Sequence, residues 1–194
     1  MDEAHDTDME IRPTAKAHEI VRQVVGTGET VVDATAGNGH DSLFLAGLVG
    51  SGGRVLAFDI QAAAIESTRN RLRRFGMVDR VELRHESHAQ ISAHVADGSV
   101  AAVMYNLGYL PGADHAVITQ CEETLRALAA VPQLLREGGV CTVVCYPGHA
   151  GGEREAAAVV AWARGLEGAL IGEPARPGAP FLIAWQRGGQ LADG

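Results

Sequence analysis

Short apolar runs recur along the chain and alternate with longer stretches in which apolar residues return at helical spacing. The short runs are typical of buried strands, and the longer stretches are typical of amphipathic helices. Because strands alternate with helices, the pattern predicts an α/β fold with a mostly parallel sheet covered on both faces. Strands are predicted at residues 31–35, 54–59, 81–85, 100–105 and 140–145, and helices at residues 13–25, 62–75, 118–136 and 156–166 and directly after residue 39.

The two ends of the chain depart from this alternation. Residues 169–172 and 180–187 are apolar and are separated by Pro174 and Pro177, which predicts an antiparallel pair that closes the sheet. Residues 1–12 are acidic and carry few apolar side chains. We therefore expect a flexible acidic tail at residues 1–12, followed by a single domain at residues 13–194.

The overall composition is that of a soluble globular protein, with 46% hydrophobic and 21% charged residues among 194. The acidic N-terminal segment lacks the basic and apolar regions of a signal peptide, and no apolar run reaches membrane-spanning length. These features predict a cytoplasmic protein without a membrane partner. The formal net charge of −8 argues against a general nucleic-acid coat and leaves room for a local basic patch.

The three cysteines, Cys121, Cys141 and Cys145, form neither a disulfide framework nor a zinc-binding pattern. Cys141 and Cys145 lie four positions apart in a predicted strand, so they share one face of it. Burial in the core is therefore expected for both, and no metal site is predicted.

A glycine-rich turn follows the first predicted strand and opens the next helix. Gly37 and Gly39 allow a tight turn and a close approach of a ligand, as in adenosine-binding α/β sheets. A dinucleotide places its diphosphate at such a helix N-terminus, but Asp33 and Asp41 flank this turn and would repel it. The two carboxylates suit a cationic cofactor such as S-adenosylmethionine. Asp41 also has the simpler role of an acid that complements the helix dipole.

Further polar residues follow the other predicted strands. Asp59 lies 20 residues beyond Gly39, where a carboxylate can bind a ribose diol, although it could also cap the next helix. His88, the segment 106–112 and His149 follow the third, fourth and fifth strands. Because the carboxyl ends of parallel strands meet at one edge, these residues are expected to line one crevice.

This arrangement resembles the class I S-adenosylmethionine-dependent methyltransferases, which have a Rossmann-like, seven-stranded sheet with helices on both faces and an antiparallel last strand. A closer resemblance is to the bacterial family described as ribosomal RNA methylases, whose members include tRNA 5-aminomethyl-2-thiouridine (mnm5s2U) methyltransferases. One departure is His115, where the family pattern often has a lysine. The resemblance rests on five motifs, namely DATAGNGHD at residues 33–41, FDIQ at 58–61, SH at 87–88, NLGYLPG at 106–112 and GH at 148–149.

The resemblance implies that S-adenosylmethionine is the cofactor and S-adenosylhomocysteine the product. Asp41 and the backbone of the glycine turn would hold the methionine end, Asp59 the ribose, and Ser87 and His88 the adenine. His88 could instead make a local hydrogen bond at a helix N-terminus. The implied cofactor-binding residues are Asp33, Ala36, Gly37, Asn38, Gly39, Asp41, Asp59, Gln61, Ser87, His88 and Asn106.

The segment Asn106-Leu107-Gly108-Tyr109 resembles the Asn-Pro-Pro-Tyr signature of enzymes that methylate nitrogen. An amide oxygen and a backbone carbonyl can accept the N–H bonds of an amine and aim its lone pair at the methyl group. The amine must lose a proton, and His149, His115 and Asp114 are the candidate acceptors. The predicted catalytic residues are Asn106, Tyr109, Asp114 and His149, and the predicted substrate-binding residues are Leu107, Gly108, Tyr109, Gly112 and His149.

The expected function is N-methylation of the 5-aminomethyl group of wobble uridine in the tRNA anticodon loop. Alternatives are methylation of ribosomal RNA or of a small amine, or a nucleotide-binding module or oxidoreductase without methyl transfer. Arg12, Lys16 and the helix end at residues 69–74 are candidate phosphate contacts. Apolar surface on the terminal hairpin would support a homodimer.

Overall fold

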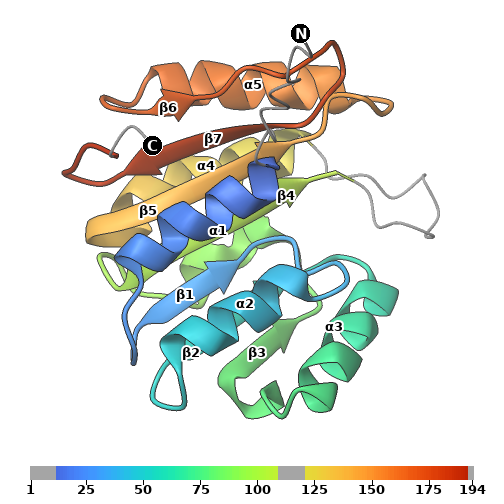
Figure 1. Ribbon diagram of the computed structural model, residues 1–194, viewed down its shortest axis with the longest axis vertical. Helices are drawn as coiled ribbons and strands as arrows, with labels where there is room; N and C mark the ends of the chain where they lie inside the picture. Colours follow the sequence, from blue (N-terminus) through green and yellow to red (C-terminus); the bar gives the residue numbers. More distant parts are fainter. Residues whose placement is uncertain (1–11, 109–120, 192–194) are drawn as a thin grey trace, which may run out of the picture.

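In a computed structural model that describes residues 12–108 and 121–191, the chain forms a seven-stranded sheet with strand order β3-β2-β1-β4-β5-β7-β6 (Figure 1). Strands β1 to β5 are mutually parallel, and β7 runs antiparallel to both β5 and β6. This confirms the predicted fold class and its antiparallel last strand. The strands are β1 (Thr30–Asp33), β2 (Arg54–Phe58), β3 (Val81–Arg84), β4 (Val100–Leu107), β5 (Leu135–Cys145), β6 (Leu170–Ile171) and β7 (Phe181–Gln186).

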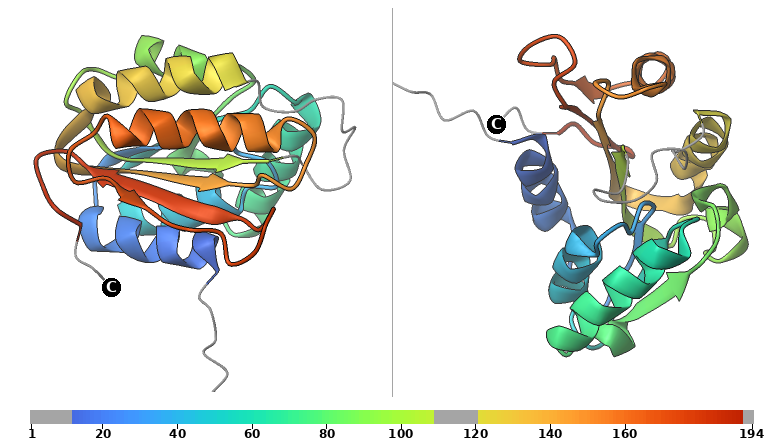
Figure 2. Two further views of the ribbon diagram at one scale, coloured as in Figure 1. Left: turned by 90° about the horizontal axis from the view of Figure 1, so that it is seen from above. Right: turned by 90° about the vertical axis from the view of Figure 1, so that its right-hand side faces the viewer.

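Helices cover both faces of this sheet, and Figure 2 shows the two layers from the side. Helices α1, α2 and α3 lie on one face, and α4, α5 and the short helix η2 lie on the other. The α-helices are α1 (Pro13–Val24), α2 (His40–Val49), α3 (Ala62–Arg74), α4 (Cys121–Leu134) and α5 (Gly152–Arg164), and the 3-10 helices are η1 (Val78–Arg80) and η2 (His88–Ala93).

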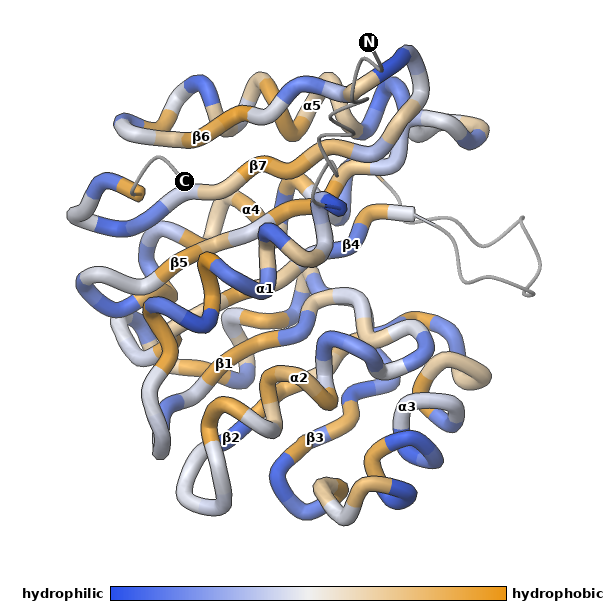
Figure 3. Tube along the Cα trace, viewed as in Figure 1, coloured by the Kyte–Doolittle hydropathy of each residue, from blue (hydrophilic) through white to orange (hydrophobic). Residues whose placement is uncertain are grey.

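Alternation along the strands builds a separate core on each face. Val31 packs with α1 and α2, whereas the next residue, Val32, packs in the core beneath α4 and α5. Both residues are completely buried, as expected for a strand covered on both sides. The central strand β4 and the second half of β5 are therefore largely hydrophobic, whereas the edge strand β3 alternates between hydrophobic and hydrophilic residues (Figure 3). Cys141 and Cys145 are buried in the α4–α5 core as predicted, and Cys121 is half-buried.

The largest difference from the predicted boundaries lies where helix α4 meets strand β5, and helix α5 begins at Gly152, four residues earlier than predicted. Helix α4 ends at Leu134 rather than at Arg136, two residues after Pro132. Strand β5 then begins at once, and residues 136–139 form an irregularity in its pairing with β4. Gly138, at φ +70°, donates its N–H to the carbonyl of Arg187 at 2.8 Å and thereby joins β5 to the end of β7. The two glycines predicted to end a helix instead lie within a strand.

Strand β4 is two residues longer than predicted and continues through Leu107. Asn106 therefore lies on the sheet and not in a loop, with its backbone fixed by pairing to Val144 of β5. A side chain on a rigid strand end is placed more precisely than one on a loop.

The surface properties bear on two further expectations. No helix in residues 12–108 or 121–191 is long and apolar enough to cross a membrane. The large hydrophobic side chains that are exposed in these ranges are Ile60 and Phe75, and neither lies in the terminal hairpin. The apolar hairpin surface that would support a homodimer is thus not found. Except for Arg12, the predicted acidic tail lies outside the described residues.

Candidate functional site

The candidate site lies at the carboxyl edge of the parallel strands, where β1, β2, β4 and β5 all end (Figure 1). The turn at residues 34–39 follows β1, Asp59 follows β2, and Tyr146 follows β5. The structure brings the predicted residues of the glycine turn, Asp59 and Asn106 to this one edge. The predicted residues Tyr109, Gly112 and Asp114, and the alternative base His115, lie outside the described residues.

The glycine turn is held against helix α3. Gly37 and Gly39 have φ angles of +50° and +76°, which glycine adopts without strain. A Cβ at residue 39 would lie 2.9 Å from the Cα of Thr68, so this position is closed to larger residues. The Thr68 hydroxyl donates to the carbonyl of Gly37 at 3.0 Å, and Ser67 donates to the Asn38 side chain at 3.0 Å. Helix α3 therefore fixes the shape of the turn.

Asp59 organises the same turn from the end of β2. Its Oδ2 accepts the N–H of Gly37 at 2.9 Å, and its Oδ1 accepts the N–H of Gln61 at 2.9 Å. Gln61 is the N-cap residue of α3, so the proposed capping role of Asp59 is real. Each carboxylate oxygen retains a second lone pair, so the same group can also accept bonds from a ribose diol.

Asp33 lies beneath the turn and is completely buried. It accepts hydrogen bonds from the Ser42 hydroxyl at 2.6 Å and from the N–H of Thr35 at 3.1 Å. Burial, reinforced by the nearby charge of Asp41, raises the pKa of Asp33 to about 7. Asp33 therefore ties the turn to α2 from below, and any direct ligand contact by it stays a prediction.

Replacing Asp33 by asparagine is expected to stabilise the protein more at about pH 8 than at about pH 5. The native carboxyl keeps its proton up to a pKa of about 7, whereas the unfolded carboxyl ionises near 3.8. The native state thus binds more protons between these values, and stability is lost as the pH rises through them. Asparagine does not ionise, and its amide can accept from Thr35 and donate to Ser42.

The difference in free energy of unfolding between Asp33→Asn and the unmodified protein should grow by roughly 2 kcal/mol over this pH range. Urea denaturation at the two pH values measures it. Asp79→Asn, at an exposed acid, serves as the control and should show no such growth. A difference for Asp33→Asn that is independent of pH would contradict the prediction.

Asp41 joins two distant segments through its two oxygens. Its Oδ1 lies 2.6 Å from Nε2 of His18 on α1, and its Oδ2 accepts the side-chain N–H of Asn106 on β4. The backbone N–H of Asn106 donates to the Thr35 hydroxyl at 2.7 Å. With Nδ2 committed to Asp41, the Asn106 Oδ1 is buried and has no hydrogen-bond partner among the described residues. It is an acceptor at the edge of the site.

His88 is buried and contacts the backbone directly after the end of β1. Its Nδ1 donates to the carbonyl of Ala34 at 3.1 Å, so the bond is long-range and not the local one considered from the sequence. Burial lowers the pKa of His88, which keeps the imidazole neutral. Its Nε2 is then a buried acceptor with no partner in the described part of the chain. Ser87 caps η2 by accepting the N–H of Ala89 at 3.2 Å.

The remaining predicted residues lie where β4 meets the loop after β5. Leu107 points into the core, and its carbonyl accepts the N–H of Tyr146 at 3.3 Å. A Cβ at Gly108 would lie 3.3 Å from the Tyr146 ring, so the ring packs closely on this glycine. Burial, together with the charge of Asp41, raises the pKa of Tyr146. Tyr146 therefore belongs to the site.

His149 is half-buried in the loop before α5, close to the buried side chain of Glu155. Glu155 accepts the Thr124 hydroxyl at 2.7 Å. Burial raises the pKa of Glu155, and the Thr124 bond and the attraction of His149 oppose that rise.

Sequence reasoning missed His18, Tyr146 and Glu155. His18 was hidden among the polar residues of an amphipathic helix, and it meets Asp41 from 23 positions away. Tyr146 directly follows β5 at the functional edge, and that position was the signal available for it. Within residues 12–108 and 121–191, no three His, Cys, Asp or Glu side chains are grouped to hold a metal ion.

Comparisons with known proteins identify RNA methylases as relatives of this chain. The family model described as "Putative rRNA methylase" matches residues 55–171. The chain is 40% identical over 164 residues to the tRNA (mnm(5)s(2)U34)-methyltransferase, chloroplastic, of Arabidopsis thaliana, which covers 80% of this chain. The chain spans only 60% of the length of that relative.

Two solved structures are similar over almost their whole length. One is a putative rRNA-methylase from Clostridium thermocellum, with a TM-score of 0.84 and 37% identity over 89% of this chain and 96% of that one. The other is a putative methyltransferase from Streptococcus mutans in complex with SAH, with a TM-score of 0.80 and 31% identity over 90% of this chain and 97% of that one.

Proposed function

The chain belongs to the "Putative rRNA methylase" family, and from this premise we propose that it transfers a methyl group from S-adenosylmethionine to a nitrogen atom of RNA. Its fold is that of the class I methyltransferases. The observation that carries the proposal is the buried, unpartnered Oδ1 of Asn106, held at the strand edge by Asp41. The glycine turn, which would hold the cofactor, and the acceptor for an amine thus lie at the same edge of the sheet.

The residues present fit S-adenosylmethionine better than a dinucleotide. Asp41 and Asp59 flank the turn, and their carboxylates favour a ligand with an ammonium and a sulfonium over a diphosphate. Neutral His88 offers an acceptor for the adenine amino group, and the exposed Ile60 offers an apolar surface next to Asp59. When bound, the cofactor supplies an electrophilic methyl group on its sulfonium.

The chain's own residues would orient the amine and take its proton. Asn106 Oδ1 accepts one N–H bond of the amine and directs the nitrogen lone pair toward the methyl group. Among the candidate proton acceptors, His149 lies in the loop after β5, at the same edge of the sheet as the end of β4 that carries Asn106. His149 is therefore our proposed base.

The substrate we propose is the 5-aminomethyl group of wobble uridine in tRNA, because the Arabidopsis relative is named for position U34 of tRNA. A primary alkylamine suits a site that offers one amide acceptor and one base. Ribosomal RNA and small amines are the alternative acceptors within the same chemistry.

The experiment that tests this function incubates the purified chain with S-adenosylmethionine and tRNA that carries 5-aminomethyl-2-thiouridine. Nucleoside mass spectrometry should show the gain of one methyl group at that uridine. Ribosomal RNA and free alkylamines are assayed beside it. Tight binding of NAD with no binding of S-adenosylhomocysteine would overturn the methyltransferase proposal.

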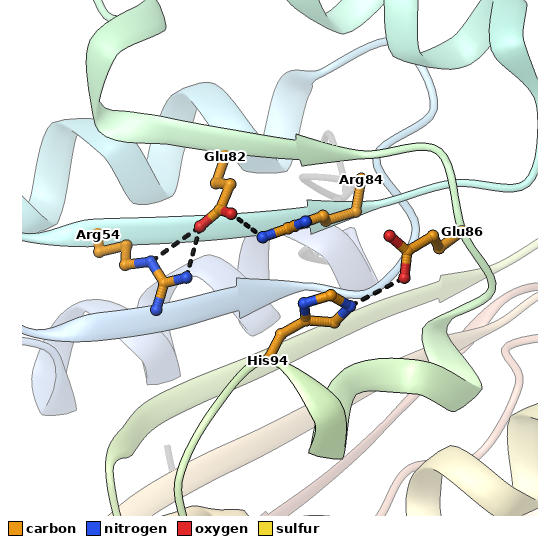
Figure 4. A network of polar contacts seen from close by, with 5 residues as sticks. All are labelled: Arg54, Glu82, Arg84, Glu86 and His94. Carbon is orange, nitrogen blue, oxygen red and sulfur yellow. Dashed lines mark hydrogen bonds and ion pairs between the residues drawn. The ribbon is translucent and has the colours of Figure 1, made fainter.

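The arginines considered for RNA contact divide by location. Helix α3 starts at the carboxyl edge and spans about 20 Å, so Arg73 and Arg74 lie toward the opposite edge. Arg71 donates to the carbonyl of Asn38 and thus supports the glycine turn. Arg84 is bound to Glu82, which also binds Arg54 (Figure 4). Those arginines are committed to the fold or distant from the site.

Arg12 and Lys16 lie at the same edge of the sheet as the candidate site. Helix α1 ends shortly before β1 begins, so its first turn lies at the carboxyl edge with the site. We expect the double variant Arg12→Ser, Lys16→Ser to weaken tRNA binding and to reduce its log–log salt slope by about 1 to 2. Arg73→Ser, Arg74→Ser is the matched control, and an equal loss in both variants would contradict this placement.

A further inference from the structure

His18 is fixed between helices α1 and α2. Its ring stacks on the Phe44 ring with centroids 3.8 Å apart and planes 1° from parallel. The guanidinium of Arg22, one turn further along α1, lies 5.3 Å from the centroid of the same Phe44 ring. The stacked ring directs Nε2 to Oδ1 of Asp41 at 2.6 Å. Since Asp41 and Phe44 are three residues apart on α2, one helix face both orients the imidazole and accepts its bond.

Asp41 links His18 to Asn106 through its second carboxylate oxygen. One carboxylate oxygen is held by His18 and the other by the amide of Asn106. The side chain of Asp41 is 11% exposed, so solvent has little access to replace either donor. A carboxylate held at both oxygens cannot rotate freely about its last bond.

The orientation of Asn106 follows from this restraint. An asparagine amide can present either its oxygen or its nitrogen, and the neighbouring groups decide which. Asp41 accepts only hydrogen bonds when it is ionised, so it binds Nδ2 and leaves Oδ1 free. That free oxygen is buried and has no partner among the described residues.

We propose that His18 is a positioning residue: through Asp41 it fixes the Asn106 amide so that Oδ1, an acceptor, faces the substrate amine. This inference rests on the proposed function for the identity of the substrate. The positioning itself is a property of the protein without ligand. His18 would act on turnover without touching either the cofactor or the substrate.

Two variants of His18 separate the hydrogen bond from the packing. His18→Phe keeps an aromatic ring on Phe44 and removes the donor to Asp41. His18→Gln loses the stacking and keeps an N–H that reaches about as far as Nε2. Ala15→Ser, at an exposed residue of the same helix, is the control. Thermal melting of all three identifies any variant that fails to fold.

The first readout is the side-chain amide signal of Asn106 in a ¹⁵N-correlated NMR spectrum, assigned with Asn106→Ala. His18→Phe should shift this signal, and His18→Gln and Ala15→Ser should leave it near its original position. The second readout is turnover. His18→Phe should lower kcat about 10- to 100-fold, with KM for tRNA and affinity for S-adenosylhomocysteine changed much less, and His18→Gln should restore most of it.

An unshifted Asn106 signal in a folded His18→Phe variant would overturn the inference. So would a His18→Gln variant as impaired as His18→Phe, because packing would then be the cause. The NMR readout uses protein without substrate. If the unmodified protein methylated no RNA while the His18→Phe shift was present, the proposed function would fail and the positioning would stand.

Discussion

Replacing Asn106 by alanine is expected to lower kcat for methyl transfer by about 100-fold or more. The variant removes the acceptor that orients the amine and leaves Oδ2 of Asp41 without its amide donor. Both losses fall on the alignment of the nucleophile, because the glycine turn and Asp59 remain in place to hold the cofactor. Affinity for S-adenosylhomocysteine should therefore fall less than about tenfold. Single-turnover kinetics and calorimetric titration measure the two quantities separately.

A neighbouring variant tests whether the effect belongs to the amide. Met104→Leu changes another residue of β4, whose side chain packs in the core, and keeps its volume and its backbone. It should retain turnover within a few-fold of the unmodified protein. If Asn106→Ala lost cofactor affinity in parallel with turnover, Asn106 would be a cofactor-binding residue, as the family resemblance also allows, and its proposed role toward the amine would be wrong.

Much of the fold could be predicted because the strands are fully buried. Val55 and Val103 lie in runs, 55–58 and 100–104, that are apolar at every position, which single-sequence patterns reveal well. The wrong predictions lie where contacts between residues distant in sequence determine the backbone conformation. Residues 136–139 read as the end of a helix, but pairing with Arg187, about 50 positions later, draws them into β5. No local pattern encodes that pairing.

The residues of the candidate site were likewise predicted only in part. Asp41 and Asp59 were found from their places just after the glycine turn and 20 residues beyond Gly39, and Asn106 from the resemblance of its segment to the Asn-Pro-Pro-Tyr signature. A side chain at residue 39 would collide with the Cα of Thr68, and no pattern in the sequence indicated this contact. His18 was not found either, because its neighbours in α1 gave no sign that its partner lies on α2. Sequence motifs predict the site residues at strand ends. The residues that support them depend on how the helices pack, which the motifs do not contain.

Replacing Asp59 by alanine is expected to weaken binding of S-adenosylhomocysteine about 100-fold. The carboxylate accepts the N–H groups of Gly37 and Gln61 and, in our proposal, the hydroxyls of the ribose. Hydrogen bonds to a charged group contribute about 1.5 to 3 kcal/mol each, and each 1.4 kcal/mol is a factor of ten in affinity. Asp59→Asn keeps one acceptor oxygen and should lose about tenfold. Calorimetric titration of the two variants measures this order.

A second ligand separates contact with the ribose from support of the turn. An analogue of S-adenosylhomocysteine that lacks the 2′-hydroxyl should bind the unmodified protein about tenfold more weakly than the parent compound. Asp59→Ala should bind the two ligands equally, since the group that distinguishes them is gone. If the variant still preferred the parent compound by the same factor, Asp59 would act only by ordering Gly37 and α3. The ribose would then be held by another residue at this edge of the sheet.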